Sequence, residues 1–296
     1  MQTAKRRAIA LLFLLTVALS LSGCINSERK QQTIIDTFAS FENAEDYVFV
    51  TWSPNRLYIR DNVIDLEDLS YEGRPCHYIS TSTKCAYFFS YHTGTESTVD
   101  LLSMSYQTLE LSHLDTIEAE CEITKAKYYN GEVYFTLWDQ DATPENAYLI
   151  YNLATAEVRN ADYDSVSNDI FDNFQSEKYT VTYKDKNYLL ENELLVKNKG
   201  TGEEKIVGYS LLKTCEQGQK IFGLGDVYGT NRAFDWYEHN GEIYIAYVYV
   251  VDGFLGYPCY VYIMKYDFDN HTMGYYTSVF MNDFPEGSLS DFRIPE

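Results

Sequence analysis

The stretch YNGEVYF at residues 129–135 recurs as HNGEIYI at residues 239–245. In both copies an Asn-Gly pair precedes alternating apolar and polar residues, which is typical of a tight turn that leads into a β-strand. Related strand openings occur at residues 55–59, 84–88 and 185–189. Five variants of one pattern indicate that the chain repeats a small β unit.

A second motif, Thr-x-Glu, follows three of these openings, at residues 108–110, 155–157 and 201–203. The successive Thr residues lie 47 and 46 positions apart, and Tyr87 and Tyr134, each within an opening, also lie 47 positions apart. Each Thr-x-Glu comes after an apolar or aromatic run. We therefore expect it to form the turn between the two outer strands of a unit.

A repeat of this length that carries several strands is the pattern of a β-propeller, in which small sheets pack around an axis. In its openings and its Thr-x-Glu turns the chain resembles degenerate propellers of bacterial surface lipoproteins, over most of residues 47–285. The run at residues 260–270 has the same character in the last unit, although it lacks Thr-x-Glu. We predict an all-β fold over residues 47–296, a propeller of five to six degenerate blades, with a β-sandwich or an open meander as alternatives.

The first 24 residues predict where the protein is sent. A basic start at residues 5–7 precedes an apolar run at residues 8–21, which ends in Leu-Ser-Gly-Cys at residues 21–24. These are the parts of a secretory signal peptide, and the last four residues resemble the lipobox of bacterial lipoproteins. The resemblance implies cleavage before Cys24 and acylation of Cys24, palmitate being one such chain, which anchors the protein extracytoplasmically in the cell membrane or outer membrane. The alternative, an uncleaved membrane helix, needs about 20 apolar residues.

A short tether is predicted between this signal and the repeats. Residues 1–23 are the expected signal peptide, and residues 24–46 are the expected lipidated cysteine and tether. Within the tether, apolar residues at helical spacing predict a short helix that lifts the domain off the lipid. These residues are Ile34, Ile35, Phe38 and Phe41.

Composition narrows the classes of fold and partner. The chain is 45% hydrophobic and contains 28 Tyr, which supplies a large core and favours sheet. Its net charge of −21 repels phosphates, so we expect no nucleic-acid partner. Apart from Cys24, an odd number of cysteines remains, and we expect at most one disulfide. These cysteines are Cys76, Cys85, Cys121, Cys215 and Cys259, of which the first two are close enough to bridge a hairpin.

Known catalytic and cofactor motifs are missing from the sequence. It contains no Gly-x-Ser-x-Gly elbow, no His-Glu-x-x-His and no phosphate-binding loop followed by Lys. The Gly-Leu-Gly at residues 223–225, followed by Gly229, lacks the dinucleotide-binding pattern, so we predict a glycine-rich loop there. We predict no cofactor, no metal and no catalytic residue, which leaves Cys24 as the site residue of the sequence.

Histidines and acidic pairs give no metal site by their spacing. The histidines are expected to be surface or turn residues; they are His77, His92, His113, His239 and His271. The acidic pairs have oxygen ligands for calcium, but Asp also bonds its own backbone in turns, and we favour that role. The pairs are Asp139 with Asp141, Asp162 with Asp164, and Asp267 with Asp269.

The sequence leaves functions of different classes open. The first hypothesis is a noncatalytic binding or scaffold module at the cell surface, for a glycan, a peptide or an envelope protein. The alternative is an extracellular glycoside hydrolase or other carbohydrate-active enzyme, which needs two carboxylates at a set separation. Asp226 and Asp235 flank Gly229 and lie near Trp236 and Tyr237, whose rings could stack on a sugar. Loop and strand ends are the more ordinary place for such acids. A third possibility is a structural subunit of an envelope complex.

Overall fold

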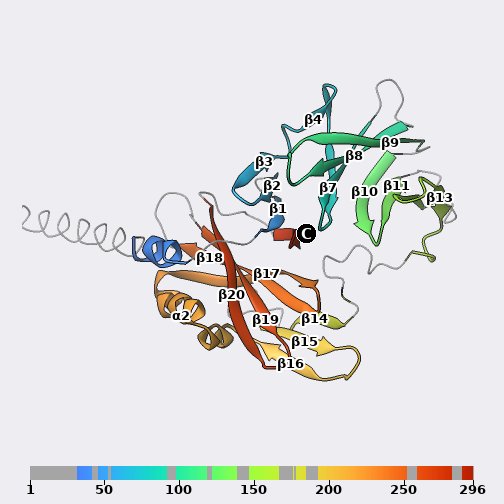
Figure 1. Ribbon diagram of the computed structural model, residues 1–296. Coiled ribbons are helices and arrows are strands. Elements are labelled where there is room, and N and C mark those ends of the chain that lie inside the picture. The colour runs from blue at the N-terminus through green and yellow to red at the C-terminus, as the bar shows by residue number, and fades with distance from the viewer. Residues whose placement is uncertain are drawn as a thin grey trace, which may run out of the picture.

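The computed structural model describes a mostly β protein built from several small antiparallel sheets, as predicted (Figure 1). Cys24, Cys121 and the strand opening at residues 185–189 lie outside the described residues. The described residues are 32–41, 46–52, 55–91, 98–118, 122–138, 147–166, 176, 178–184, 193–251, 259–281 and 289–295.

Three sheets are four-stranded meanders in which each strand pairs with the next strand along the chain. Sheet 2 contains β6 (His77–Thr81), β7 (Cys85–Tyr91), β8 (Thr98–Ser105) and β9 (Leu111–Glu118). Sheet 3 contains β10 (Glu122–Tyr129), β11 (Glu132–Trp138), β12 (Tyr148–Asn152) and β13 (Val158–Ala161). Sheet 5 contains β17 (Gly229–His239), β18 (Glu242–Val251), β19 (Cys259–Asp267) and β20 (Thr272–Met281).

Sheet 1 joins the two ends of the described chain, in the order β21-β1-β2-β3. Its strands are β21 (Leu289–Arg293), β1 (Val48–Trp52), β2 (Asn55–Ile59) and β3 (Asn62–Asp65). β21 pairs antiparallel with β1, with Val48 opposite Arg293 and Thr51 opposite Leu289. The C-terminal strand therefore supplies the first strand of a sheet whose other strands come from the N-terminal part. The opening predicted at residues 55–59 consequently begins the third strand of its sheet, whereas the other openings that are described begin a second strand.

Sheet 4 has three described strands. The hairpin of β4 (Ser70–Tyr71) and β5 (Arg74–Pro75) forms a separate two-stranded sheet. The strands of sheet 4 are β14 (Tyr179–Tyr183), β15 (Leu194–Asn198) and β16 (Glu204–Val207). The Thr-x-Glu at residues 201–203 lies between β15 and β16, where the Thr-x-Glu of sheets 2 and 3 joins the third strand to the fourth. The strands of sheet 4 therefore correspond to the second, third and fourth strands of the other sheets.

The predicted hairpin turns are confirmed in their backbone conformation. Between β10 and β11, Asn130 and Gly131 have φ of 48° and 85°, and between β17 and β18, Asn240 and Gly241 have φ of 53° and 81°. Two successive positive φ values are the mark of the tight turn that Asn-Gly favours, because Asn tolerates this region and Gly has no Cβ to clash.

The turns between third and fourth strands share one geometry in sheets 2 to 5, with the fourth residue past the third strand at positive φ. These residues are Leu109 (59°), Ala156 (57°), Gly202 (74°) and His271 (54°). The last strand residue caps the turn: Asn152 Oδ1 accepts the Ala154 and Thr155 amides at 2.9 and 3.1 Å, and Asp267 Oδ1 accepts the Asn270 amide at 3.0 Å. The last unit thus keeps the turn although its sequence lacks Thr-x-Glu.

Helices cover one side of sheet 5. Residues 32–39 are helical, as predicted, and are joined there by η3 (Tyr209–Thr214) and α2 (Glu216–Tyr228). The prediction of a glycine-rich loop at residues 223–225 is wrong, because these residues lie within α2. Ile221 and Leu224 of α2 are buried, so packing of one face outweighs the low helix propensity of glycine. A Cβ on Gly218 would lie 2.0 Å from the Leu212 carbonyl oxygen, so this glycine lets α2 begin against η3.

Shared hydrophobic clusters fix which sheets are neighbours. One cluster joins sheets 4 and 5 with the helices, a second joins sheets 5 and 1, a third joins sheets 1 and 2, and a fourth joins sheets 2 and 3. The spatial order is therefore 4, 5, 1, 2, 3. In the part of the chain described, sheets 3 and 4 share no cluster, and residues 167–175 between them are not described.

Candidate functional site

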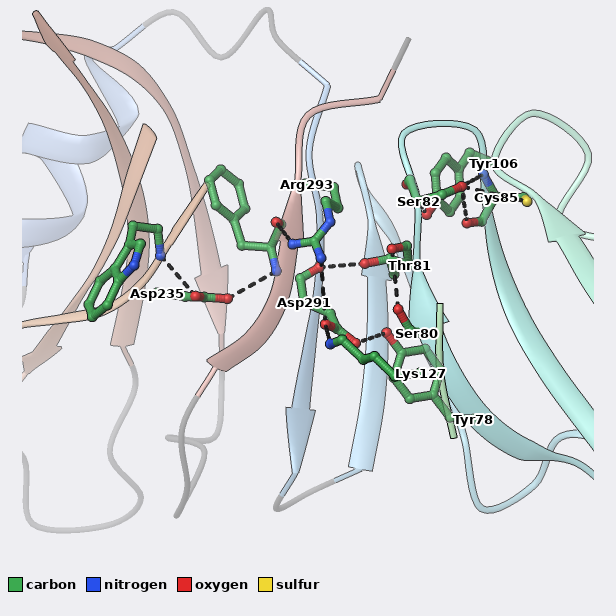
Figure 2. A network of polar contacts seen from close by, with 12 residues as sticks. Tyr78, Ser80, Thr81, Ser82, Cys85, Tyr106, Lys127, Asp235, Asp291 and Arg293 are labelled. Atoms are coloured by element: carbon green, nitrogen blue, oxygen red, sulfur yellow. Dashed lines mark hydrogen bonds and ion pairs between the residues drawn. The ribbon is translucent and has the colours of Figure 1, made fainter. Parts of the chain in front are cut away.

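The first strands of four sheets lie next to one another in the order β17, β21, β6, β10. Polar and charged side chains are buried where these strands meet, and they form a connected network (Figure 2). Because burying a charge is costly unless it is paired, a network of this kind is the most distinctive chemical feature of the described residues.

Asp291 of β21 is the centre of this network, with 2% of its surface exposed. Its Oδ2 accepts a hydrogen bond from Tyr78 Oη of β6 at 2.7 Å, and its Oδ1 forms an ion pair and hydrogen bond with Lys127 Nζ of β10. Its backbone carbonyl accepts a hydrogen bond from Thr81 Oγ1 at 2.7 Å. One residue of the C-terminal strand therefore bonds the first strands of sheets 2 and 3 (Figure 2).

Electrostatics keep the Asp291 carboxylate ionised. Burial by itself disfavours the charge, but the opposite charges of Lys127 and Arg293 and the hydrogen bonds outweigh it and lower the pKa of Asp291. The Arg293 Nη2 atom lies 3.8 Å from Asp291 Oδ1. Asp291 also has a φ of 51°, a left-handed conformation that Asp and Asn adopt more readily than other side chains with a Cβ.

Asp235 of β17 fastens the other side of β21. Its Oδ2 accepts the Phe292 amide at 3.1 Å and its Oδ1 accepts the Trp236 amide at 2.8 Å. A β-bulge between Ala233 and Asp235 shifts the register of β17 at this point. Burial raises the pKa of Asp235 to about 7, because desolvation exceeds the opposing effect of the two amides and of Arg293.

Opposite pKa shifts in two neighbouring carboxyl groups are typical of an acid–base pair in a hydrolase. In Asp235 and Asp291, however, every carboxylate oxygen accepts a hydrogen bond from this chain, and each side chain is at most 4% exposed. Three of these four bonds join different strands, and the fourth, from the Trp236 amide, lies within β17. The role of this arrangement is therefore structural: it fastens β21 to the first strands of sheets 5, 2 and 3.

The aromatic residues considered for sugar stacking lie between sheets. Trp236 packs edge-to-face on Tyr183 of sheet 4, with ring centroids 5.1 Å apart. Tyr237 lies beneath the Arg293 guanidinium at 4.8 Å and meets Phe292 edge-on. Both rings therefore serve contacts within the fold. Of the two acids considered with them, Asp235 is placed in the network and the Asp226 side chain is outside the described residues.

A second buried ion pair holds the β4–β5 hairpin on sheet 2. Arg74 Nη1 of β5 lies 2.8 Å from Asp100 Oδ2 of β8, and Thr116 Oγ1 of β9 donates to Asp100 Oδ1 at 2.8 Å. His113 Nε2 lies 3.0 Å from Thr116 Oγ1 at the exposed edge of this cluster. The cluster ties the hairpin to two strands of the sheet, β8 and β9.

The other candidate ligands have turn or surface roles. Asp162 Oδ1 accepts the Ser165 amide at 2.7 Å, as Asp267 does for Asn270, which confirms the turn role expected for these acids. His271 is the positive-φ residue of its turn and His113 is exposed, as predicted. Within the described ranges, no group of His, Cys, Asp and Glu could hold a metal ion. Asp139, Asp141 and His92 lie outside those ranges.

The described cysteines form no disulfide. They are Cys76, Cys85, Cys215 and Cys259. Cys76 and Cys85, the pair close enough in sequence to bridge a hairpin, are therefore unbridged. Among the helices that are described, none is both long and apolar enough to cross a membrane.

The chain matches no protein-family model and no curated protein sequence. Among solved structures it is similar to TolB from Acinetobacter baumannii, at 10% identity and a TM-score of 0.31 over 86% of this chain and 68% of that one. It is also similar to an oligogalacturonate lyase in complex with manganese, at 14% identity and a TM-score of 0.29 over 51% of this chain and 39% of the lyase. A third is the S527A variant of the AtxE2 isopeptidase with astexin3-dC4 bound, at 11% identity and a TM-score of 0.27 over 76% and 46% of the two chains. Likeness at this level assigns no activity.

Proposed function

We propose that the chain is a lipid-anchored, noncatalytic binding or scaffold module whose sheets are the five blades of a degenerate propeller. The order 4, 5, 1, 2, 3 and the pairing of β21 with β1 support the ring, because a C-terminal strand in the first blade joins the chain ends. The Leu-Ser-Gly-Cys at residues 21–24 supports the anchor.

The observation that carries the binding role is the unequal length of the connections at the two ends of the sheets. In sheet 3, the first and third connections are residues 130–131 and 153–157, whereas the second connection is residues 139–147. Sheet 5 repeats this contrast, since its second connection is residues 252–258 and its first is residues 240–241. In a ring, the longer connections gather on one face, over a frame fastened by the Asp291 network, and they supply the ligand surface.

The anchor is tested by metabolic labelling of the full chain with a palmitate analogue in a bacterial host. The wild-type chain takes up label and fractionates with the membrane, whereas Cys24→Ser takes up none and is released or retained as precursor. Uptake of label by Cys24→Ser, or unlabelled wild-type chain in the cytosol, contradicts the anchor.

The binding role is tested with the purified lipid-free domain carrying Cys24→Ser, titrated calorimetrically with cell-wall glycan fragments and envelope peptides. We expect saturable binding to one of these that is lost when residues 139–147 are replaced by a Gly-Ser segment of equal length. The matched control changes residues 153–157, which connect the third and fourth strands of sheet 3 at the end opposite to residues 139–147. They are replaced by the sequence of residues 199–203, which form the same kind of turn in sheet 4. Loss of binding in the control alone, or hydrolysis of a glycan fragment, refutes the proposal.

A further inference from the structure

The helix at residues 32–39 is packed firmly into the domain, which differs from the stand-off tether that the sequence suggests. Ile34 and Phe38 are 0% and 1% exposed. The Phe38 ring stacks on Tyr260 of β19, with centroids 4.1 Å apart and planes within 7° of each other. Burial of these two apolar side chains stabilises the docked helix, so the helix moves with the domain.

The docked helix and α2 form one continuous helical side of the molecule. Phe41 belongs to the same hydrophobic cluster as Ile221 and Leu224 of α2. The Lys220 ammonium lies 5.9 Å from the centre of the Phe41 ring. We call the exposed surface of residues 32–40, η3 and residues 216–224 of α2 the helical face. It lies on the side of the molecule away from sheets 2 and 3 (Figure 1).

Covalent geometry limits how far this face can lie from an anchor at Cys24. Eight residue steps separate Cys24 from residue 32, and a fully extended chain covers at most about 3.6 Å per residue, or roughly 29 Å. A domain the size of residues 47–296 has a radius of gyration of about 18 Å, and hence a diameter of roughly 45 Å. The reach is shorter than the domain, so the start of the docked helix stays close to the lipid.

The helical face is suited in charge to lie near headgroups. Its exposed charged side chains on the described residues balance, with Asp36 and Glu216 against Lys213 and Lys220. The chain as a whole carries a net charge of −21. Anionic headgroups therefore repel this face less than they repel the average surface of the protein.

We propose that the helix at residues 32–39 is a rigid stand that holds the helical face against the lipid surface and points sheets 2 and 3 away from it. This inference rests on the proposed acylation of Cys24. Its partner is the headgroup layer of the bilayer in which the acyl chains are inserted. The domain then has one preferred orientation, because the anchor enters at one side and that side is fixed to the core.

The test uses the acylated full chain in phosphatidylcholine vesicles that contain lipids with a nitroxide on the headgroup. A fluorescent unnatural amino acid is placed at position 220 in α2, or at position 158 in β13, where Val158 is 47% exposed. We expect quenching at position 220 to exceed quenching at position 158 several-fold. Inserting a flexible 20-residue Gly-Ser segment between residues 31 and 32 should bring the two values together, with the dock itself unchanged.

Two readouts separate the failure of this inference from failure of the anchor. Intact mass reports whether Cys24 carries acyl chains, and quenching reports orientation. Equal quenching at positions 220 and 158 in a chain whose mass shows acylation overturns the rigid stand and leaves the anchor standing. An unacylated mass overturns the anchor and the stand with it.

Discussion

Replacing the buried Asp235 by Asn should flatten the dependence of stability on pH. The carboxyl group has a pKa of about 7 in the folded protein, compared with an ordinary value of 3.8. Between these values the unfolded chain releases the proton while the folded chain keeps it. The free energy of unfolding therefore falls as pH rises, and the contribution present below pH 4 is lost above pH 7.

The size of this effect follows from the shift. Each pKa unit corresponds to 1.36 kcal/mol, so a shift of about three units amounts to roughly 4 kcal/mol between pH 4 and pH 7. The amide side chain in Asp235→Asn keeps one acceptor oxygen, for the Phe292 or the Trp236 amide, and leaves the other amide unsatisfied at a cost of about 1–3 kcal/mol. That cost does not vary with pH. The prediction therefore concerns the slope and not the absolute stability.

Urea unfolding, followed by tyrosine and tryptophan fluorescence at pH 5, 6, 7 and 8, measures this slope. Wild type should lose about 1 kcal/mol more per pH unit between pH 5 and 7 than Asp235→Asn does. Asp164→Asn, which changes an exposed carboxyl group in a turn, should follow wild type. Parallel curves for wild type and Asp235→Asn would show that the buried carboxyl group does not titrate in this range, and the reasoning from burial would be refuted.

Three further changes test the network and the repeated turn, each by urea unfolding at pH 7. Lys127→Met leaves the Asp291 charge buried without its ammonium and should lower the free energy of unfolding by about 3–5 kcal/mol. Adding Asp291→Asn to the same chain should restore much of this loss. A double variant as unstable as Lys127→Met alone would contradict the pairing. Tyr78→Phe removes one donor to Asp291 and should cost about 1–3 kcal/mol, so a neutral result would count against that bond. Ala156→Gly relieves a positive φ and should stabilise by up to about 1 kcal/mol, whereas Ala154→Gly should not; equal effects would refute the strain.

Local features of the fold were predictable because their causes lie within a few residues. Asn-Gly at residues 130–131 and 240–241 requires two positive φ values, and this preference is readable in the sequence. The turn after β19 shows the limit of a literal motif. Asp267 caps it and His271 takes the positive φ, so a strand-ending Asn, Asp or Ser is a better signal than Thr-x-Glu.

The network was not predictable because its members are far apart in the chain and form no motif. Tyr78 and Asp291 are separated by 213 positions, and Lys127 and Asp291 by 164. In the sequence, Lys127 is one of 23 basic residues and Asp291 one of 44 acidic residues. Only the placement of β21 beside β6 and β17 brings them together. The helix α2 was not predicted for a related reason. Its glycines indicate a loop, and the burial of Ile221 and Leu224 that stabilises the helix is visible only in the structure.

The contributions of the two buried aspartates to the stability of β21 change in opposite directions as pH rises. Asp291 has a lowered pKa, so its contribution to stability is present above the ordinary aspartate value of 3.8 and is lost as pH falls. Asp235 has a raised pKa, so its contribution is present at low pH and is lost as pH rises toward 7. Together the two groups hold the C-terminal strand most tightly near pH 4 and progressively less tightly up to neutral pH. The stability of the strand that joins the ends of the described chain therefore responds to mild changes in pH, and hydrogen exchange of the Phe292 amide should follow that response.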